Sequence, residues 1–285
     1  MGDDSDGGER TRPVRPNRAV RLAYRSLLRG RPAGALPASV YWPLAAKYRQ
    51  QYAVRVGDYS PLLRPYKTVE IDPSSVERLT GRPYPPWENR FGLFGTVRDG
   101  DWDRKPLTAD PERYPGVCLY GGRAVRDTVL YRSLRTRFEQ AAPWSETELY
   151  SVLRTELDAG RSVWHGCDTE AEIRRRCERL DTLYQTLRRD GFRSQLSLAH
   201  RRRSPPDGDA FPRVMRHEVA VDIGRDGAPL LVEGKHRFML ADLLGIESIP
   251  VVVYVRHRDW MERRQAATDR PATRPTHPDL RTMPD

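Results

Sequence analysis

The sequence has few cysteines, and their placement excludes the common cysteine-based sites. The three residues, Cys118, Cys167 and Cys177, form no CxxC pair, so neither a disulfide framework nor a zinc ribbon is expected. His165, Cys167 and Cys177 could still supply three ligands to a metal. The ordinary interpretation of Cys177 is a small buried hydrophobe, because it falls on the apolar stripe of an expected helix.

Long apolar segments are also missing. No stretch approaches the roughly 18 consecutive apolar residues that a membrane-spanning helix needs. The first 17 residues, MGDDSDGGERTRPVRPN, carry acids and glycines where a secretory signal needs an apolar segment. We therefore expect an intracellular, cytoplasmic protein with no membrane partner, whose 38% of hydrophobic residues suffices for one sizeable core or two small ones.

Lysine is scarce, whereas arginine is abundant. Only four of the 49 basic residues are lysines, and 39 acidic residues leave a net charge of +10. Such a balance favours nucleic acid, nucleotides or anionic surfaces as partners only where the charge is concentrated. The densest runs, Arg174–Arg176 and Arg201–Arg203, are short and separated. The bulk charge alone therefore does not predict a DNA-binding protein.

Both ends of the chain are polar. Residues 1–16 and most of 259–285, chiefly the part after Ala266, are rich in charge, Pro and Gly, so we expect them to be disordered. Between Arg18 and Leu28, apolar residues at helical spacing alternate with arginines, which predicts a basic amphipathic helix. A second helical stretch is expected from Leu44 to Tyr52. Residues 17–66 thus form an N-terminal extension that packs on the main domain or binds a partner.

The main domain is expected to span 67–258. It begins with a strand at 67–71 that Asp72-Pro73 ends, and Val117–Tyr120 is a second strand candidate. Residues 127–191 predict a helical insertion of three helices. We expect caps at Asp127, at the Ser145/Glu148 capping box and at the Thr169/Glu172 capping box, with Gly191 ending the third helix.

After residue 210 the pattern becomes strand, strand, glycine, helix, strand. In the segment 217–223, Val219, Val221 and Ile223 alternate with polar or small residues, which predicts a strand with one buried face. Pro229–Val232 returns as a strand, Lys235–Leu244 is helical, and Ile249–Val255 is apolar throughout, as in a strand covered on both faces. The sequence therefore predicts an α/β fold with a small sheet.

The segment 233–237, EGKHR, carries an electrostatic conflict. It places Lys235, His236 and Arg237 in the first turn of a helix, whose partial positive charge disfavours cations. A bound anion, most simply a phosphate on the free N–H groups, would relieve this conflict. Alternatively, Arg237 pairs with Glu233 or another acid, and the other two side chains face solvent.

The string LLVEGKHRFMLADLLGIESIPVVV at 230–253 resembles the ParB/sulfiredoxin-like superfamily. That motif has an apolar strand, Gly-x-[His/Arg]-Arg, an alanine, a helix-ending glycine and Ile-Pro-Val. The matching residues here are Gly234, Lys235, His236, Arg237, Ala241, Gly245 and Ile249–Val251. Two weaker likenesses lie at 180–195, with Gly191, and at 69–73.

The resemblance implies a small mixed sheet whose Gly-x-x-Arg turn cradles the phosphates of ATP or CTP. It makes Gly234 the glycine that lets the backbone approach the phosphates closely, and it assigns phosphate contacts to His236 and Arg237. Lys235 is an added cation and Gln195 a further ligand candidate. Partition proteins of this superfamily have Glu and Arg in place of Lys235 and His236, so this chain departs from the motif that carries their CTP switch. Sulfiredoxins have a nucleophilic cysteine in the place of Lys235, and its absence here excludes reduction of a sulfinic acid by that route. Only about 27 residues follow His257, too few for the helix-turn-helix domain of the partition proteins.

Magnesium is the expected companion of a bound triphosphate. Asp101 and Asp103, in the acidic turn 99–103, offer the oxygen ligands that Mg²⁺ prefers. The alternative for this turn is a solvated loop, opened by Gly100 and anchored by Trp102.

Three functional hypotheses follow. The first is a nucleoside triphosphate-binding protein, acting as an NTPase, a phosphotransferase or a nucleotide-gated switch. The second is a nucleic-acid-associated protein that uses its dispersed charge and the basic helix at 18–28. The third is a scaffold with an empty pocket. The identity of the nucleotide and the oligomeric state, a homodimer included, stay open.

Overall fold

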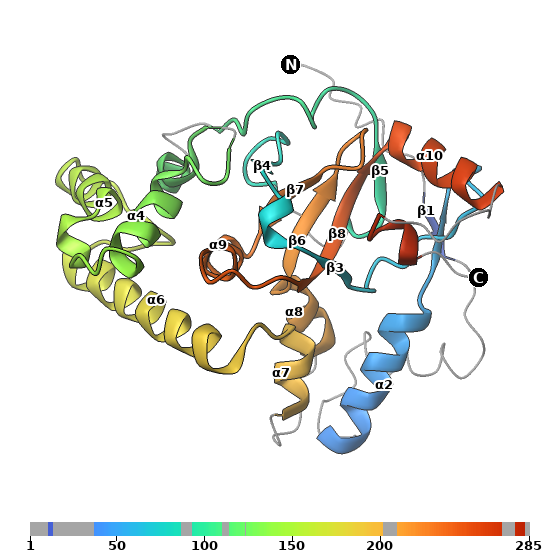
Figure 1. Ribbon diagram of the computed structural model, residues 1–285, viewed down its shortest axis with the longest axis horizontal. Coiled ribbons are helices and arrows are strands. Elements are labelled where there is room, and N and C mark those ends of the chain that lie inside the picture. The colour runs from blue at the N-terminus through green and yellow to red at the C-terminus, as the bar shows by residue number, and fades with distance from the viewer. Residues whose placement is uncertain are drawn as a thin grey trace.

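The protein has an α/β fold built on a six-stranded mixed sheet (Figure 1). The computed structural model describes residues 11–13, 37–86, 93–109, 114–122, 124–201, 210–269 and 277–282. The basic helix expected at 18–28 lies outside these ranges. Among the described helices, none combines the length and apolarity needed to cross a membrane.

The main sheet has the strand order β3-β8-β6-β7-β4, and β5 pairs with the far end of β8. β8 runs parallel to β6 and β5 and antiparallel to β3, and β6 and β7 form an antiparallel hairpin. The strands are β3 (Val69–Ile71), β4 (Arg78–Leu79), β5 (Thr96–Arg98), β6 (Val219–Ile223), β7 (Pro229–Glu233) and β8 (Ile249–His257). β1 (Thr11–Pro13) and β2 (Val54–Val56) form a separate two-stranded sheet.

The central strands are buried on both faces. This confirms the prediction for β8, but the single buried face expected for β6 is wrong, because every residue of β6 is buried. Ala220 is small enough to pack on the second face, and Asp222 is neutralised inside the protein. The Asp222 carboxylate accepts hydrogen bonds from Arg82 Nε at 2.7 Å, Thr80 Oγ1 at 2.7 Å and Val255 N at 3.1 Å. A buried charge with this many partners is tolerated.

Helices α2 (Ala38–Gln51), α7 (Gln195–Arg201) and α8 (Ala210–Arg216) cover one face of the sheet, below it in Figure 1. Tyr48 of α2 packs with Phe211 of α8 in a T-shaped pair 5.6 Å apart, and both share a core with Tyr254 of β8. The helix expected at 44–52 therefore starts six residues earlier, with Pro43 inside it. This part of the N-terminal extension belongs to the core of the main domain.

Helix α9 (Lys235–Leu243) covers the opposite face and separates the sheet from the helical insertion, the lobe at the left of Figure 1. The insertion comprises α4 (Val129–Phe138), α5 (Glu148–Asp158) and α6 (Glu170–Asp190), which share one core with the sheet. Asp242 of α9 joins the two parts. Its carboxylate accepts hydrogen bonds from Arg126 Nη2 at 2.8 Å and from the Tyr131 hydroxyl at 2.7 Å.

The ends of the insertion helices were partly predictable. The Thr169/Glu172 capping box and the stop at Gly191 are confirmed. The other two caps are wrong, because Thr128 and Thr147, which directly precede α4 and α5, accept the hydrogen bonds from the helix N–H groups. The strand expected at Val117–Tyr120 is also wrong, since Pro115–Tyr120 is a 3₁₀ helix.

The expectation that most of 259–285 is disordered is wrong for the described part of this segment. α10 (Arg258–Asp269) is helical, and residues 277–282 dock against it. Asp279 is fully buried and binds Arg256 Nη2 at 2.6 Å, Arg264 Nη1 at 2.7 Å and Trp260 Nε1 at 2.9 Å. Burial opposes ionisation of Asp279, but the two guanidinium groups outweigh it and lower the pKa of its carboxyl group.

We predict that Asp279→Asn lowers the free energy of unfolding by about 3–5 kcal/mol, because it leaves two guanidinium groups buried without their counter-charge. Urea denaturation at pH 7 measures this loss. Glu139→Gln is the matched control, since Glu139 forms an exposed pair with Arg135 and should cost no more than about 0.5 kcal/mol. A loss for Asp279→Asn as small as that of the control would contradict the prediction.

Candidate functional site

A pocket of about 350 Å³ lies between the end of β7, the start of α9 and the insertion. All five residues predicted as phosphate ligands line it, although Gln195 is about 40 residues from the others in sequence. The complete lining consists of Tyr120, His165, Leu183, Gln195, His217, Glu233, Gly234, Lys235, His236 and Arg237.

Gly234 is required by the backbone at this turn. Its φ of 74° and ψ of 25° are left-handed, a conformation that strains any residue with a Cβ. A Cβ here would also approach Val219 Cγ2 of β6 to 2.9 Å. The close approach made by this glycine is thus to the neighbouring strand, and it brings the first turn of α9 against β6.

Lys235 is buried, with 6% of its surface exposed. Its Nζ donates a hydrogen bond to the Val232 carbonyl oxygen at 2.7 Å and lies 4.8 Å from the centre of the Tyr120 ring. A carbonyl oxygen and a π face are both favourable partners for an ammonium group. These contacts hold the Lys235 side chain beside the pocket.

His236 does not contribute the positive charge expected of it. Its Nε2 lies 3.3 Å from Trp164 Nε1, and because an indole N–H can only donate, Nε2 must be the acceptor and carry no proton. Burial, together with the nearby His165 and Lys235, lowers the pKa of His236 to about 3. The predicted cationic triplet is therefore a pair, formed by Lys235 and Arg237.

The Arg237 guanidinium lies 5.9 Å from the centre of the Phe192 ring, and its Nη2 donates to the His217 carbonyl oxygen. Its Nη1 is buried and donates no hydrogen bond to any described residue. Burial lowers the pKa of Arg237, an effect that the negative charges of Glu218 and Glu233 oppose. The guanidinium thus reaches the pocket with one donor group still available.

Gln195 is held at the pocket by a buried carboxylate. Glu218, which is fully buried, accepts hydrogen bonds from the backbone N–H groups of Gln195 at 2.9 Å and Leu196 at 3.2 Å, the first two residues of α7. The side chain of Gln195 makes no hydrogen bond within the described ranges. Glu218 therefore fixes the start of α7 and leaves the Gln195 amide available to a ligand.

The two aspartates predicted as magnesium ligands lie elsewhere. Asp101 and Asp103 each bind Arg225 Nη2 at 2.7 Å, and Arg225 lies in the turn before β7, whereas the pocket lies after β7. Five residues of strand place the two sites roughly 17 Å apart. Arg225 neutralises this acidic turn, and neither aspartate lines the pocket.

One grouping of potential metal ligands occurs among the described residues, formed by Asp99, His257 and Asp259. Both His257 nitrogens already have partners, because Nδ1 accepts from Asp259 N at 3.1 Å and Nε2 lies 2.8 Å from the Gly100 carbonyl oxygen. Asp99 binds Arg258 at 2.7 Å. Cys177 is buried in the apolar core, as its place on the helix stripe predicts. The protein's own contacts therefore account for these candidate ligands.

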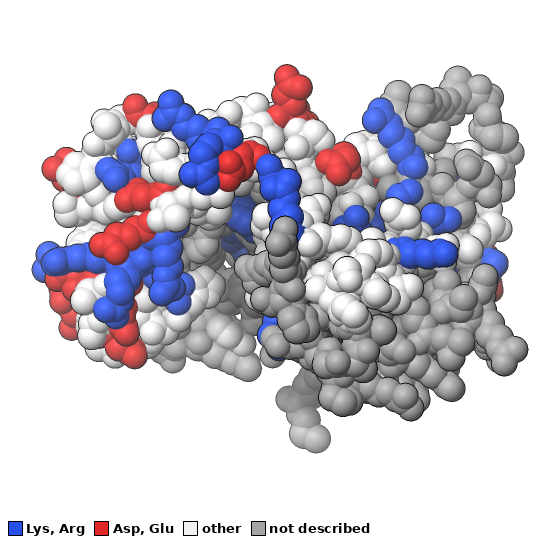
Figure 2. Space-filling view, turned by 90° about the horizontal axis from the view of Figure 1, so that it is seen from below, with Lys and Arg blue, Asp and Glu red and all other residues white. Residues whose placement is uncertain are grey.

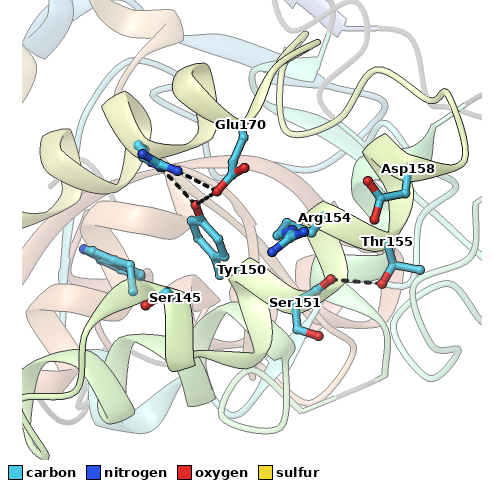
Figure 3. A pocket seen from close by; sticks show the side chains of 9 residues that line it. Ser145, Tyr150, Ser151, Arg154, Thr155, Asp158 and Glu170 are labelled. Carbon is cyan, nitrogen blue, oxygen red and sulfur yellow. Dashed lines mark hydrogen bonds and ion pairs between the residues drawn. The ribbon is translucent and has the colours of Figure 1, made fainter.

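A second hollow of about 700 Å³ lies on the insertion, between α5 and α6 (Figure 3). Ser151, Arg154, Thr155 and Asp158 form one polar face of α5, at spacings of three or four residues, but nothing in the sequence distinguishes this face from an ordinary solvated one. Glu170 accepts hydrogen bonds from the Tyr150 hydroxyl at 2.6 Å and from Arg174 at 2.8 Å. Much of the charge in this hollow is thus paired within it.

Five residues that line the first pocket were not predicted to bind the nucleotide, although His165 was a candidate metal ligand: Tyr120, His165, Leu183, His217 and Glu233. His217 and Glu233 flank the predicted strands, so their place at the same end of the β6–β7 hairpin could have been deduced. The other three come from the helical insertion and the segment before it, whose docking no local pattern predicts.

Comparison of the chain with protein-family models, with curated proteins and with solved structures finds no match.

We predict that His236 makes stability depend on pH. Its pKa is about 3 in the folded protein and about 6.5 in the unfolded chain. Below pH 6.5 the unfolded chain binds a proton that the folded protein does not, so stability falls as the pH falls. The titration of His236 should lower the free energy of unfolding by about 2 kcal/mol between pH 7 and pH 5.

Urea denaturation at both pH values measures this loss. His236→Gln keeps an acceptor for Trp164 but removes the titration, so its stability should fall by about 2 kcal/mol less than that of the wild type. His200→Gln, on the exposed side of α7, should show the wild-type loss. Equal losses in the wild type and His236→Gln would rule out a buried neutral imidazole.

Proposed function

We propose that this protein binds a nucleoside triphosphate, ATP or CTP, in the pocket at the start of α9. The observation that carries the proposal is the convergence of Gly234, Lys235, His236, Arg237 and Gln195 on one cavity. These residues were selected from the sequence, by the cationic helix start and by the resemblance of 230–253 to the ParB/sulfiredoxin-like superfamily. The pocket volume falls in the range of ligand sites, about 300–1,000 Å³.

Electrostatics supports an anionic ligand. The backbone N–H groups of the first three residues of α9 have no acceptor within the helix, and the helix dipole adds positive potential there. Lys235 and Arg237 place two more positive charges at the same point, and Arg237 Nη1 lacks a hydrogen-bond partner within the described structure. A phosphate group would satisfy all these donors at once.

A phosphate in this position would be held without the imidazole of His236. Because that ring is neutral and bound to Trp164, its role is to fix the first turn of α9. The phosphate contacts we propose are therefore the α9 N–H groups, Lys235 and Arg237. This differs from the assignment that the resemblance alone suggests.

Phosphoryl transfer or hydrolysis would need more than binding. Glu233 is the carboxylate that lines the pocket in the described structure, so it is the residue proposed to hold Mg²⁺ that enters with the nucleotide, or to accept a proton from an attacking hydroxyl group. Asp101 and Asp103 are too far away for either role. The binding step is the core of the proposal, and the reaction class is secondary to it.

Binding of nucleic acid through dispersed charge has less support. Blue and red side chains alternate over the insertion, at the left of Figure 2. Because many arginines there are neutralised locally, this face lacks the concentrated positive potential that attracts a polyanion. The ion pairs on this lobe are Arg132–Glu148, Arg135–Glu139, Arg137–Asp181, Arg161–Glu156, Arg174–Glu170, Arg175–Glu172 and Arg189–Asp190.

The remaining basis for nucleic-acid binding is the N-terminal segment, and a deletion tests it. Removing residues 1–66 would also remove α2, which belongs to the core, so the deletion must stop at residue 36. We expect the full chain and the 37–285 form to bind a DNA duplex equally weakly at 150 mM salt, as measured by fluorescence anisotropy. A steep salt dependence that the deletion abolishes would instead favour the nucleic-acid hypothesis.

Isothermal titration with ATP, CTP and GTP in the presence of Mg²⁺ tests nucleotide binding. We predict that Arg237→Ala lowers the affinity for the preferred triphosphate by about tenfold or more, because one charge-assisted hydrogen bond is lost. Arg154→Ala, in the hollow on the insertion, removes an arginine outside the pocket and should leave the affinity unchanged. No binding heat with any triphosphate, or equal effects of the two substitutions, would overturn the proposal.

A further inference from the structure

The wall of the pocket that faces the start of α9 comes from outside the β6–β7–α9 unit. Tyr120, His165 and Leu183 form this wall, and they belong to the helical insertion and the 3₁₀ helix before it. The start of α9 adds Lys235 and Arg237 to the same lining. The pocket therefore combines cationic groups with aromatic and aliphatic ones, as a ligand with a phosphate tail and a ring would require.

His165 lies in a turn that is held in an unfavourable conformation. Trp164 has a φ of 42° and His165 a φ of 65°, both in the left-handed region that residues other than glycine avoid. The turn is closed by backbone hydrogen bonds between Val163 and Cys167, at 2.9 and 2.6 Å. Arg176 adds a hydrogen bond to the His165 carbonyl oxygen at 3.0 Å. Surrounding contacts thus impose this strain on two adjacent residues.

The consequence of this turn is that its two ring-bearing residues point different ways. The Trp164 side chain is 2% exposed and binds His236. His165 is exposed at the pocket wall, where its ring makes a T-shaped contact with the His236 ring at 6.3 Å, and neither ring nitrogen makes a hydrogen bond to a described residue. Lys235, His236 and Arg237 all have protein partners. Strain that presents a polar ring without hydrogen bonds to a cavity is typical of a ligand-binding position.

We propose that His165 determines specificity by binding the heterocyclic base of the nucleotide, with Leu183 beside the ring and the phosphates at the start of α9. This inference rests on the proposed function. Although the residue is exposed, the pocket walls partly shield its ring from water, and this desolvation, with Arg176 and Lys235, lowers the pKa of His165, so the imidazole is neutral near pH 7. A neutral imidazole offers one donor and one acceptor, which suits a base edge where an amino group adjoins a ring nitrogen.

The test compares ligands that share the phosphates but differ in the base. ATP, CTP and inorganic tripolyphosphate, each with Mg²⁺, are titrated into the wild-type chain, His165→Ala and His165→Gly. Both substitutions should lower the affinity for the preferred nucleotide about tenfold, as expected for the loss of one hydrogen bond. The affinity for tripolyphosphate should stay within about twofold of the wild-type value. Arg237→Ala should instead weaken all three ligands.

The two variants also separate the ring from the turn. Glycine accepts the left-handed backbone and alanine does not, so His165→Gly should melt at a temperature no lower than His165→Ala. Equal loss of nucleotide affinity in both then assigns the effect to the missing imidazole.

The inference is overturned if the substitutions leave the nucleotide affinity unchanged, or if they weaken tripolyphosphate by the same factor. It is also overturned if the wild type binds tripolyphosphate as tightly as ATP and CTP, since the base would then contribute nothing, although the phosphate site would stand. If the wild type binds none of the three ligands, the proposed function itself fails.

Discussion

The close approach of Gly234 to Val219 is the constraint on which the site depends. The left-handed glycine lets the chain leave β7 and begin α9 directly against Val219 of β6, where a Cβ on residue 234 would not fit. This contact fixes the direction of α9, and therefore the positions of Lys235, His236 and Arg237 at its first turn. It also brings Asp242, farther along the same helix, to the arginine and tyrosine that hold the insertion. A single glycine thus positions the first turn of α9 at the pocket and the contact of Asp242 with the insertion.

Many of the arginines that the structure describes have a structural role. Arg82 neutralises Asp222 inside the sheet, Arg225 closes the acidic turn, and Arg256 and Arg264 surround Asp279. The planar guanidinium group suits these roles because it binds both oxygens of a carboxylate. Lys235 differs from them, since a carbonyl oxygen and an aromatic ring are among its partners. The position of Lys235 and Arg237 in one pocket, and not the net charge, singles out the start of α9.

The sequence predicted what short-range patterns determine. The capping box of α6, the apolar strand β8 and the glycine turn before α9 all depend on neighbours within a few residues, and all three are confirmed. Local patterns could not show that Asp279 finds Arg256 and Arg264 at 23 and 15 residues' distance, so the polar segment around it looked unstructured. The place of His165 in the pocket was missed for the same reason. It depends on where the insertion docks, which is a property of the assembled core.

The location of the pocket at the junction of the insertion and the sheet has a thermodynamic consequence. A ligand there touches segments more than 100 residues apart in the chain, and so it acts as a reversible cross-link between them. The contribution of the ligand to the free energy of unfolding grows with the logarithm of the ligand concentration, and it reaches about 2.7 kcal/mol at 100 times the dissociation constant. The attachment of the insertion to the sheet would then become tighter as the ligand concentration rises, and the rigidity of this helical lobe would report the occupancy of the pocket.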